Sequence, residues 1–214
     1  VGFRDVSAFA VNGGRDTAVL YDSAATSDTF TGTPTQSLMS GPGFSVRAKG
    51  FPTVTARASQ NGRADEAKLY GSPGDDVFAA GPLWSRLGAA DGSFRIVADG
   101  FPRVLANGGT GGYDKADLYG GAGNDTLVAK PTHSQLYGAG FFSQATAFAY
   151  VRAHSGGGND FAAFHDNASG ADDFRADAAA GYLSAVMSFA TDLSRTEGRR
   201  ITFRHDGEGR IEMM

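Results

Sequence analysis

Two adjacent carboxylate pairs are the residues of this sequence with the clearest potential for chemistry. Asp75 and Asp76 form one pair, and Asp172 and Asp173 form the other. Paired carboxylates can share general acid and general base work in the cleavage of a sugar polymer. Arginines beside them could stabilise charge, and the candidates are Arg95, Arg103 and Arg152. A polysaccharide lyase or hydrolase is therefore the enzyme hypothesis.

The recurrence of these aspartates argues against catalysis. Asp76 has counterparts at Asp28, Asp125 and Asp172. A position that recurs several times is more simply a structural turn residue than a member of one catalytic site. The four histidines have no metal-ligand spacing, and the sequence has neither a Cys nor a Gly-x-Ser-x-Gly motif. The sequence predicts a protein that is not an enzyme.

Aromatic side chains offer a second kind of chemistry, which is stacking on sugar rings. A tyrosine follows a leucine in three equivalent stretches, and the chain has one tryptophan. The candidate glycan-binding residues are Tyr21, Tyr70, Tyr119 and Trp84. Exposed rings on a flat β surface also pack on one another. Glycan binding and mutual packing are the two interpretations.

Composition and charge exclude several classes of protein. The 214 residues include 31 Gly and no Cys. This glycine content, about twice the usual, argues for turn-rich β structure, because each Gly inside a helix costs about 0.5–1 kcal/mol. The 19 Lys and Arg against 23 Asp and Glu give no basic field for nucleic acid or anionic membrane. No apolar run approaches the roughly 20 residues of a membrane-spanning helix.

An internal repeat of about 49 residues organises the chain. Its first block, Asp-x-Ala-x-Leu-Tyr, occurs at 16–21, 65–70 and 114–119, with a weaker copy at 160–165. The steps between copies are 49, 49 and 46 residues. A second block, Gly-Phe-x-x-Val-x-Ala, occurs at 2–8, 50–56 and 100–106, with a variant at 147–153. Self-similarity at a fixed period indicates a stacked repeat architecture.

The apolar pattern within a repeat indicates strands. Val54, Ala56 and Ala58 alternate with polar residues, which is the period of a strand. Gly, Pro and Asn separate such runs. About five short strands per repeat are too few to enclose a core, so the repeats must stack. The prediction is an all-β, parallel β-solenoid (β-helix) of about four repeats with about two coils each; a β-propeller or sandwich is the alternative.

Stacking at this period predicts ladders of equivalent residues along the solenoid. The expected interior ladder is Leu20, Leu69, Leu118 and Phe164, and the expected exterior ladder is Tyr21, Tyr70 and Tyr119. The solenoid is expected over residues 1–174, beginning in mid-repeat as a fragment of a longer repeat array. Residues 175–214 are expected to form a degenerate last repeat or a C-terminal cap, with a helix over 178–195 as the alternative for this end.

One stretch resembles a known calcium-binding repeat. Gly120 to Val128 reads Gly-Gly-Ala-Gly-Asn-Asp-Thr-Leu-Val and is similar to the nonapeptide of repeats-in-toxin β-rolls. The resemblance implies calcium as a ligand, with Asp76, Asp114 and Asp125 as its carboxylates. In that family the nonapeptides run in tandem, whereas here the next full repeat is 49 residues away. The alternative is a set of Gly-Asp turns whose carboxylates accept backbone N–H bonds and need no cofactor.

A longer resemblance covers most of the chain. The run Asp-x-Ala-x-Leu-Tyr, then Gly-Asp-Asp-x-Phe, then Gly-Phe-x-x-Val-x-Ala resembles tandem repeats of large secreted or cell-surface proteins of planctomycete-type bacteria. This resemblance implies an extracellular, fibrous or adhesive scaffold without known activity. Its expected partners are neighbouring repeats, copies of the same protein and surface polysaccharide. The rival functions are a calcium-dependent glycan-binding module and a β-helix polysaccharide-active enzyme.

One segment distinguishes these functions. The second repeat departs most from the others between Gly81 and Gly92, a segment that includes Trp84, Arg86 and Asp91. A cleft at this place would favour ligand binding over a purely structural role.

Overall fold

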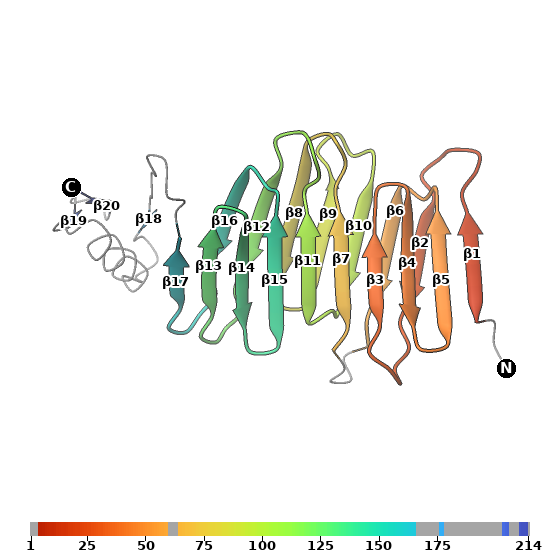
Figure 1. Cartoon of the computed structure of the whole chain (residues 1–214), viewed down its shortest axis with the longest axis horizontal. Helices are drawn as coiled ribbons and strands as arrows, with labels where there is room; N and C mark the ends of the chain where they lie inside the picture. The colour runs from red at the N-terminus through yellow and green to blue at the C-terminus, as the bar shows by residue number, and fades with distance from the viewer. Residues whose placement is uncertain (1–3, 60–63, 166–175, 178–202, 206–209, 214) are drawn as a thin grey trace.

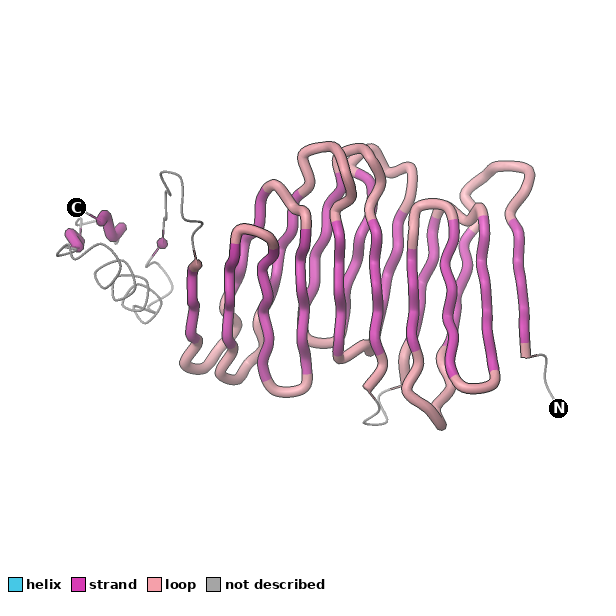
Figure 2. The backbone as a smooth tube through the Cα atoms, viewed as in Figure 1, coloured by secondary structure: helices cyan, strands magenta, loops and turns pink. Residues whose placement is uncertain are grey.

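Two facing β-sheets make up most of the protein (Figures 1 and 2). The computed structural model describes residues 4–59, 64–165, 176–177, 203–205 and 210–213. A separate three-stranded sheet contains β18 (Ala176–Asp177), β20 (Arg210–Met213) and β19 (Phe203–His205). The expected solenoid boundary at 174 and the alternative helix over 178–195 lie outside the described residues.

We call the larger sheet sheet A and the smaller one sheet B. The strand order in sheet A is β1 (Asp5–Phe9), β5 (Phe44–Lys49), β4 (Gln36–Gly41), β3 (Thr29–Gly32), β7 (Glu66–Tyr70), β11 (Arg103–Asn107), β15 (Phe141–Thr146), β14 (His133–Gly138), β13 (Thr126–Lys130) and β17 (Phe161–Phe164). The order in sheet B is β16 (Tyr150–His154), β12 (Lys115–Tyr119), β8 (Asp76–Gly81), β9 (Trp84–Ala89), β10 (Arg95–Asp99), β6 (Thr53–Arg57) and β2 (Thr17–Tyr21).

Each of the first three repeats contributes five strands, as predicted. In the first repeat, β2 lies in sheet B, β3 to β5 form an antiparallel meander in sheet A, and β6 returns to sheet B. The second repeat starts on the other side, with β7 in sheet A and its meander, β8 to β10, in sheet B. Strands of successive turns pair in parallel, as β2 does with β6. The predicted all-β parallel solenoid is confirmed. The prediction of about two coils per repeat is wrong, because the chain crosses between the sheets three times per repeat and so completes only one and a half turns.

The predicted ladders of residues one repeat apart are wrong. The chain crosses between the sheets three times per repeat, so equivalent strands of successive repeats lie on opposite sheets. Leu20 of β2 is therefore the cross-strand neighbour of Ala56 on β6, and Tyr21 is the cross-strand neighbour of Arg57. Parallel partners are separated by 35 residues (Lys115 and Tyr150) to 42 residues (Thr53 and Arg95).

Phenylalanines of the second sequence block meet, in the core between the sheets, the phenylalanines that follow the recurring Asp28 and Asp76 by two residues. The ring of Phe30 lies 6.0 Å from that of Phe101, and Phe78 lies 5.8 Å from Phe148. Phe101 and Phe148 sit in the connections that lead into β11 and β16, so they fill the space where the chain crosses between sheets. Phe30 and Phe78 are fully buried. This packing explains why the phenylalanine of the second block recurs along the chain together with the Asp-x-Phe pair.

Glycine-rich loops also stack along the solenoid. Loop 108–114 lies against loop 71–75, where the backbone N–H of Tyr113 donates to Oδ1 of Asp75 at 2.8 Å. Loop 155–160 lies against loop 120–125 in the same way, and the N–H of Gly157 donates to the carbonyl of Gly121 at 2.9 Å. Backbones this close leave no room for side chains between them. Loop stacking accounts for much of the glycine content.

Candidate functional site

Aspartates pair from turn to turn of the solenoid, and all of them except the half-buried Asp160 are buried. In each pair the backbone N–H of the first aspartate donates to Oδ1 of the second, at 2.7, 2.8 and 2.9 Å. The pairs are Asp28 with Asp65, Asp76 with Asp114, and Asp125 with Asp160. The first aspartate of each pair also accepts a backbone N–H at its Oδ2. The donors are Ser23 for Asp28, Ser72 for Asp76 and Gly121 for Asp125. These carboxylates hold the corners of the turns.

The three residues implied as calcium ligands do not form one cluster. Asp76 and Asp114 belong to one pair and Asp125 to the next. In the described part of the chain, three carboxylates come within 4.8 Å of one another at Asp22, Asp28 and Asp65 instead. Both side-chain oxygens of Asp28 accept hydrogen bonds, from the Ser23 N–H and the Thr26 hydroxyl.

Burial perturbs two of the paired aspartates. It raises the pKa of Asp114 above the ordinary 3.8, and the neighbouring carboxylates Asp76 and Asp75 add to the increase. Burial also raises the pKa of Asp125, with a contribution from the charge of Asp160. The folded state therefore takes up these protons at a higher pH than the unfolded chain. The stability that this uptake contributes is present at low pH and is lost as the pH rises through the folded pKa.

Asp114→Asn is expected to raise the melting temperature at pH 7.5 by a few degrees, at roughly 2–4 °C per kcal/mol. The amide oxygen of asparagine still accepts the N–H of Asp76, while the buried like charge is removed. Wild type is expected to gain stability as the pH falls from 7.5 toward 4.5, and the variant to gain less. Thermal melting over this range measures both effects.

Ion pairs act in a different pH window. Lys68 and Arg103 hold the pKa of Glu66 below its ordinary 4.5 against the opposing effect of burial, and Arg152 lowers the pKa of Asp117. The stability that these ion pairs contribute is lost only as the pH falls below the ordinary carboxylate pKa values.

A calcium titration provides the contradicting outcome for the Asp114 prediction. A melting temperature that rises by many degrees with millimolar CaCl₂ in wild type but not in Asp114→Asn would contradict the hydrogen-bonded corner and identify a calcium ligand.

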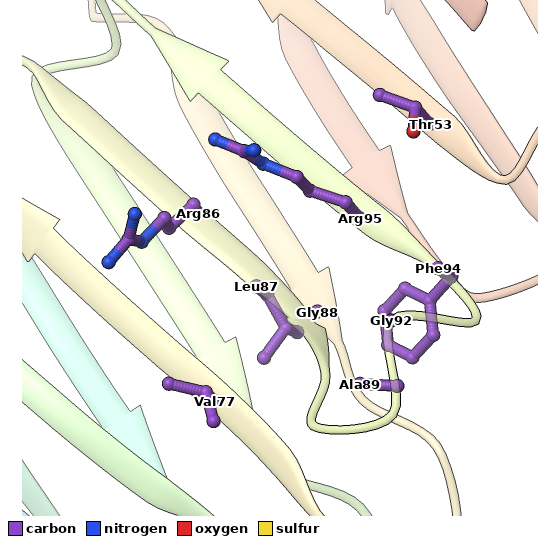
Figure 3. A pocket seen from close by; sticks show the side chains of 9 residues that line it. All are labelled: Thr53, Val77, Arg86, Leu87, Gly88, Ala89, Gly92, Phe94 and Arg95. Atoms are coloured by element: carbon purple, nitrogen blue, oxygen red, sulfur yellow. The ribbon is translucent and has the colours of Figure 1, made fainter.

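A pocket of about 360 Å³ lies on the exterior of sheet B, on the segment where the second repeat departs from the others (Figure 3). Its lining comes from β6, β8, β9, β10 and the turn before β10: Thr53, Val77, Arg86, Leu87, Gly88, Ala89, Gly92, Phe94 and Arg95. The sequence-predicted residue Arg86 lines this pocket. Trp84 and Asp91 from the same segment do not belong to the lining.

Three rings form a row on the same face of sheet B. Tyr119 stacks on His154 with centroids 4.5 Å apart and planes 8° apart, and Trp84 lies 5.7 Å from Tyr119. Because the rings of Tyr119 and His154 stand face to face, they cover much of each other's stacking surface, whereas Trp84 is tilted by 37° against Tyr119. The structure thus brings together two of the four predicted aromatic residues. Tyr70 lies on sheet A, and Tyr21 lies on β2 beside Arg57.

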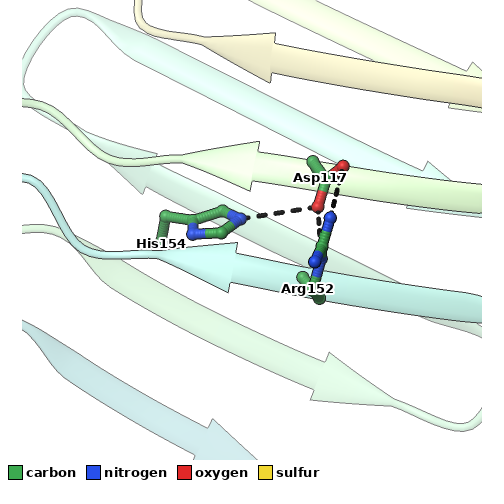
Figure 4. A network of polar contacts seen from close by, with 3 residues as sticks. All are labelled: Asp117, Arg152 and His154. Atoms are coloured by element: carbon green, nitrogen blue, oxygen red, sulfur yellow. Dashed lines mark hydrogen bonds and ion pairs between the residues drawn. The ribbon is translucent and has the colours of Figure 1, made fainter. Parts of the chain in front are cut away.

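A charged network lies next to this row (Figure 4). Arg152 donates from Nε to Oδ1 of Asp117 at 2.7 Å and from Nη2 to Oδ2 at 3.2 Å. Nε2 of His154 lies 3.4 Å from the same Asp117 oxygen. Sequence analysis missed Asp117 and His154, because they are 37 residues apart and pair through the turn of the solenoid rather than through the 49-residue repeat.

The residues of the enzyme hypothesis are dispersed. Arg103 lies on sheet A, where it binds Glu66 at 2.8 Å, whereas Arg95 and Arg152 lie on sheet B. Asp76 is fully buried and its carboxylate accepts the N–H of Ser72. The second carboxylate pair, Asp172 and Asp173, lies outside the described residues.

Comparisons of the chain with protein-family models, curated proteins and solved structures find no match. Within the residues that the structure describes, no helix has the length and apolar character to cross a membrane. The candidate site is thus defined by geometry alone, as the pocket on sheet B with the two arginines that line it, Arg86 and Arg95.

Proposed function

We propose that this chain is a rigid, non-catalytic segment of a secreted bacterial surface protein, where it serves as a structural and adhesive scaffold. The observation that carries the proposal is the unbroken pairing of ten strands in sheet A, from β1 to β17. At about 4.8 Å per strand, the nine steps of this sheet span roughly 43 Å. The Asp pairs and stacked loops join successive turns in addition to the strand pairing, which favours a stiff element.

Strand β1 supports end-to-end joining. All its residues are exposed, including Val6, although Val6 and Ala8 are level with Val46 and the buried Ala48 of β5. The face of β1 that corresponds to the core is therefore open, and one backbone edge of the strand has no neighbouring strand among the residues that the structure describes. Open edges accept further strands. We infer that another turn of solenoid, supplied by a second copy of this chain, covers this end.

End-to-end association is expected to depend on the backbone of Ser7. The backbone carbonyl of Arg4 and the backbone N–H of Ala10 form hydrogen bonds to β5. The backbone N–H and C=O groups of the even-numbered residues of β1 therefore point toward β5, and those of Ser7 point toward the open edge. Ser7→Pro removes one outward donor and is expected to abolish concentration-dependent association in sedimentation velocity. Ser7→Ala keeps the donor and serves as the control, with association expected to match wild type.

The proposal fails if wild type remains a compact monomer at the highest concentrations reached. It also fails if Ser7→Ala and Ser7→Pro reduce association equally, because a side-chain effect would then replace strand addition. Negative-stain electron microscopy of the associated fraction adds a direct test, since end-to-end joining predicts rods of uniform width rather than irregular clusters.

A further inference from the structure

We propose that the pocket on sheet B binds a carboxylate-bearing sugar of an acidic polysaccharide, with Arg86 and Arg95 as the residues that contact the carboxylate. This inference names a ligand for the proposed adhesive role. The test uses the monomeric chain, so it does not depend on end-to-end association.

The two arginines lie close together on one face. Arg86 is level with Val97 and Arg95 is level with Gly88, so they are diagonal neighbours on the antiparallel strands β9 and β10. Such neighbours are about 7–8 Å apart. Figure 3 shows both side chains projecting from these strands at the pocket. Both arginines are exposed, which leaves them accessible to a ligand from solvent.

Neither arginine has an ion-pair partner among the described residues, whereas Arg103 and Arg152 each bind a carboxylate. In a chain with a net charge of −4, two adjacent guanidinium groups without an anion mark a local positive site. The planar guanidinium fork matches a carboxylate in two parallel hydrogen bonds.

Comparison of the repeats shows that this pair is not needed by the fold. Equivalent positions follow from the registers of the three meanders: Arg86 corresponds to Leu38 and Gln135, and Arg95 to Ser45 and Phe142. The same meander therefore forms without either arginine. Their presence in the second repeat alone is better explained by a ligand than by the stability of the turn.

No aromatic ring covers the strands at the pocket, in contrast to the equivalent place in the third repeat. In the third repeat, Tyr137 and Phe142 stack with centroids 6.1 Å apart. The second repeat has Gly88 and Arg95 at these two places, so no ring covers the strands. Gly88 also permits the backbone of Phe94 to lie close to β9, because a Cβ on Gly88 would be only 2.8 Å from the Phe94 carbonyl oxygen.

The lining fits a sugar better than an acidic peptide side chain. Val77 offers exposed apolar surface, Thr53 offers a hydroxyl group, and the arginines offer charge. A sugar acid presents apolar C–H faces, hydroxyl groups and a carboxylate on a single ring, so it can use all three features. The volume of about 360 Å³ is near the lower end for small-molecule sites. That size favours one or two sugar units of a chain that continues over the sheet.

The test measures binding of polygalacturonate to the whole chain by isothermal titration calorimetry, at a protein concentration where it is monomeric. Wild type is expected to bind, and Arg86→Gln/Arg95→Gln to bind at least about tenfold more weakly. Arg86→Lys/Arg95→Lys keeps the charge but loses the fork and is expected to fall between the two. The matched control, Arg47→Gln/Lys49→Gln, removes two exposed charges from β5 of sheet A and is expected to stay within about twofold of wild type.

Four results would overturn the proposal. The first is no binding of polygalacturonate by folded wild type. The second is an equal loss in the β5 control, which would indicate non-specific attraction. The third is binding of neutral dextran with the same affinity, since the carboxylate would then be irrelevant. The fourth is binding of polyglutamate with the same affinity and arginine dependence, which would replace the sugar by an acidic peptide.

Discussion

Gly112→Ala is expected to lower the free energy of unfolding by about 3 kcal/mol, whereas Gly74→Ala is expected to change it by no more than about 0.5 kcal/mol. Gly112 has a φ of +81°, in the left-handed region that alanine disfavours. A Cβ at this position would overlap the carbonyl group of Gly74 and lie 2.8 Å from the backbone nitrogen of Asp75. Backbone atoms of a stacked loop cannot move aside without separating two turns.

The two glycines lie against each other, which makes Gly74 a close control. A Cβ on Gly74 would have Ser72 Oγ as its nearest neighbour at 3.6 Å, and Gly74 does not have a positive φ. Urea unfolding followed by circular dichroism measures both variants. Equal losses of stability would show that loop stacking is not what requires glycine at position 112.

Phe78→Ala is expected to cost about 3–5 kcal/mol of unfolding free energy, the largest loss predicted for a single substitution in this protein. Phe78 has no exposed surface, packs on Phe148 and lies level with Leu87 of β9 and Ala116 of β12. Its removal leaves a cavity between the sheets that the paired strands cannot close.

Phe161→Ala is the matched control, because Phe161 is also a strand phenylalanine but is 44% exposed on β17. Its expected cost is about 1 kcal/mol or less. Urea unfolding at fixed temperature compares the two variants. The prediction is contradicted if both phenylalanines cost the same, since burial between the sheets would then not determine stability.

The strands and their stacking could be predicted from the sequence because the responsible signals are local. Alternation in Val54, Ala56 and Ala58 identifies β6 and the residue that follows it, and the recurrence of Asp-x-Ala-x-Leu-Tyr identifies β2, β7 and β12. The meanders were not predicted, because a period of 49 residues does not say how many times the chain changes sheets. Pro34, Pro82 and Pro131 were the available signal, since each falls in the first hairpin turn of a meander.

The site was predicted only in part, because the sequence period does not show which turns of the solenoid are adjacent. Asp76, Asp114 and Asp125 were identified by their glycine context, but their partnership depends on which turns are adjacent. Asp65 and Asp160 were visible as the first residue of a repeated block, and the missing knowledge was that they accept a hydrogen bond from the preceding turn. Arg95 was selected for catalysis, whereas its surroundings form a pocket with Arg86.

The change of sheet with every repeat gives an array of such repeats a bifacial surface. A binding group that arises in one repeat and spreads by duplication appears alternately on the two sides, so the array presents it in opposite directions. On either side the group returns after two repeats, which add five strands to each sheet, or about 24 Å along the axis. Such an array can cross-link two layers of polymer, and its avidity for each layer grows with length.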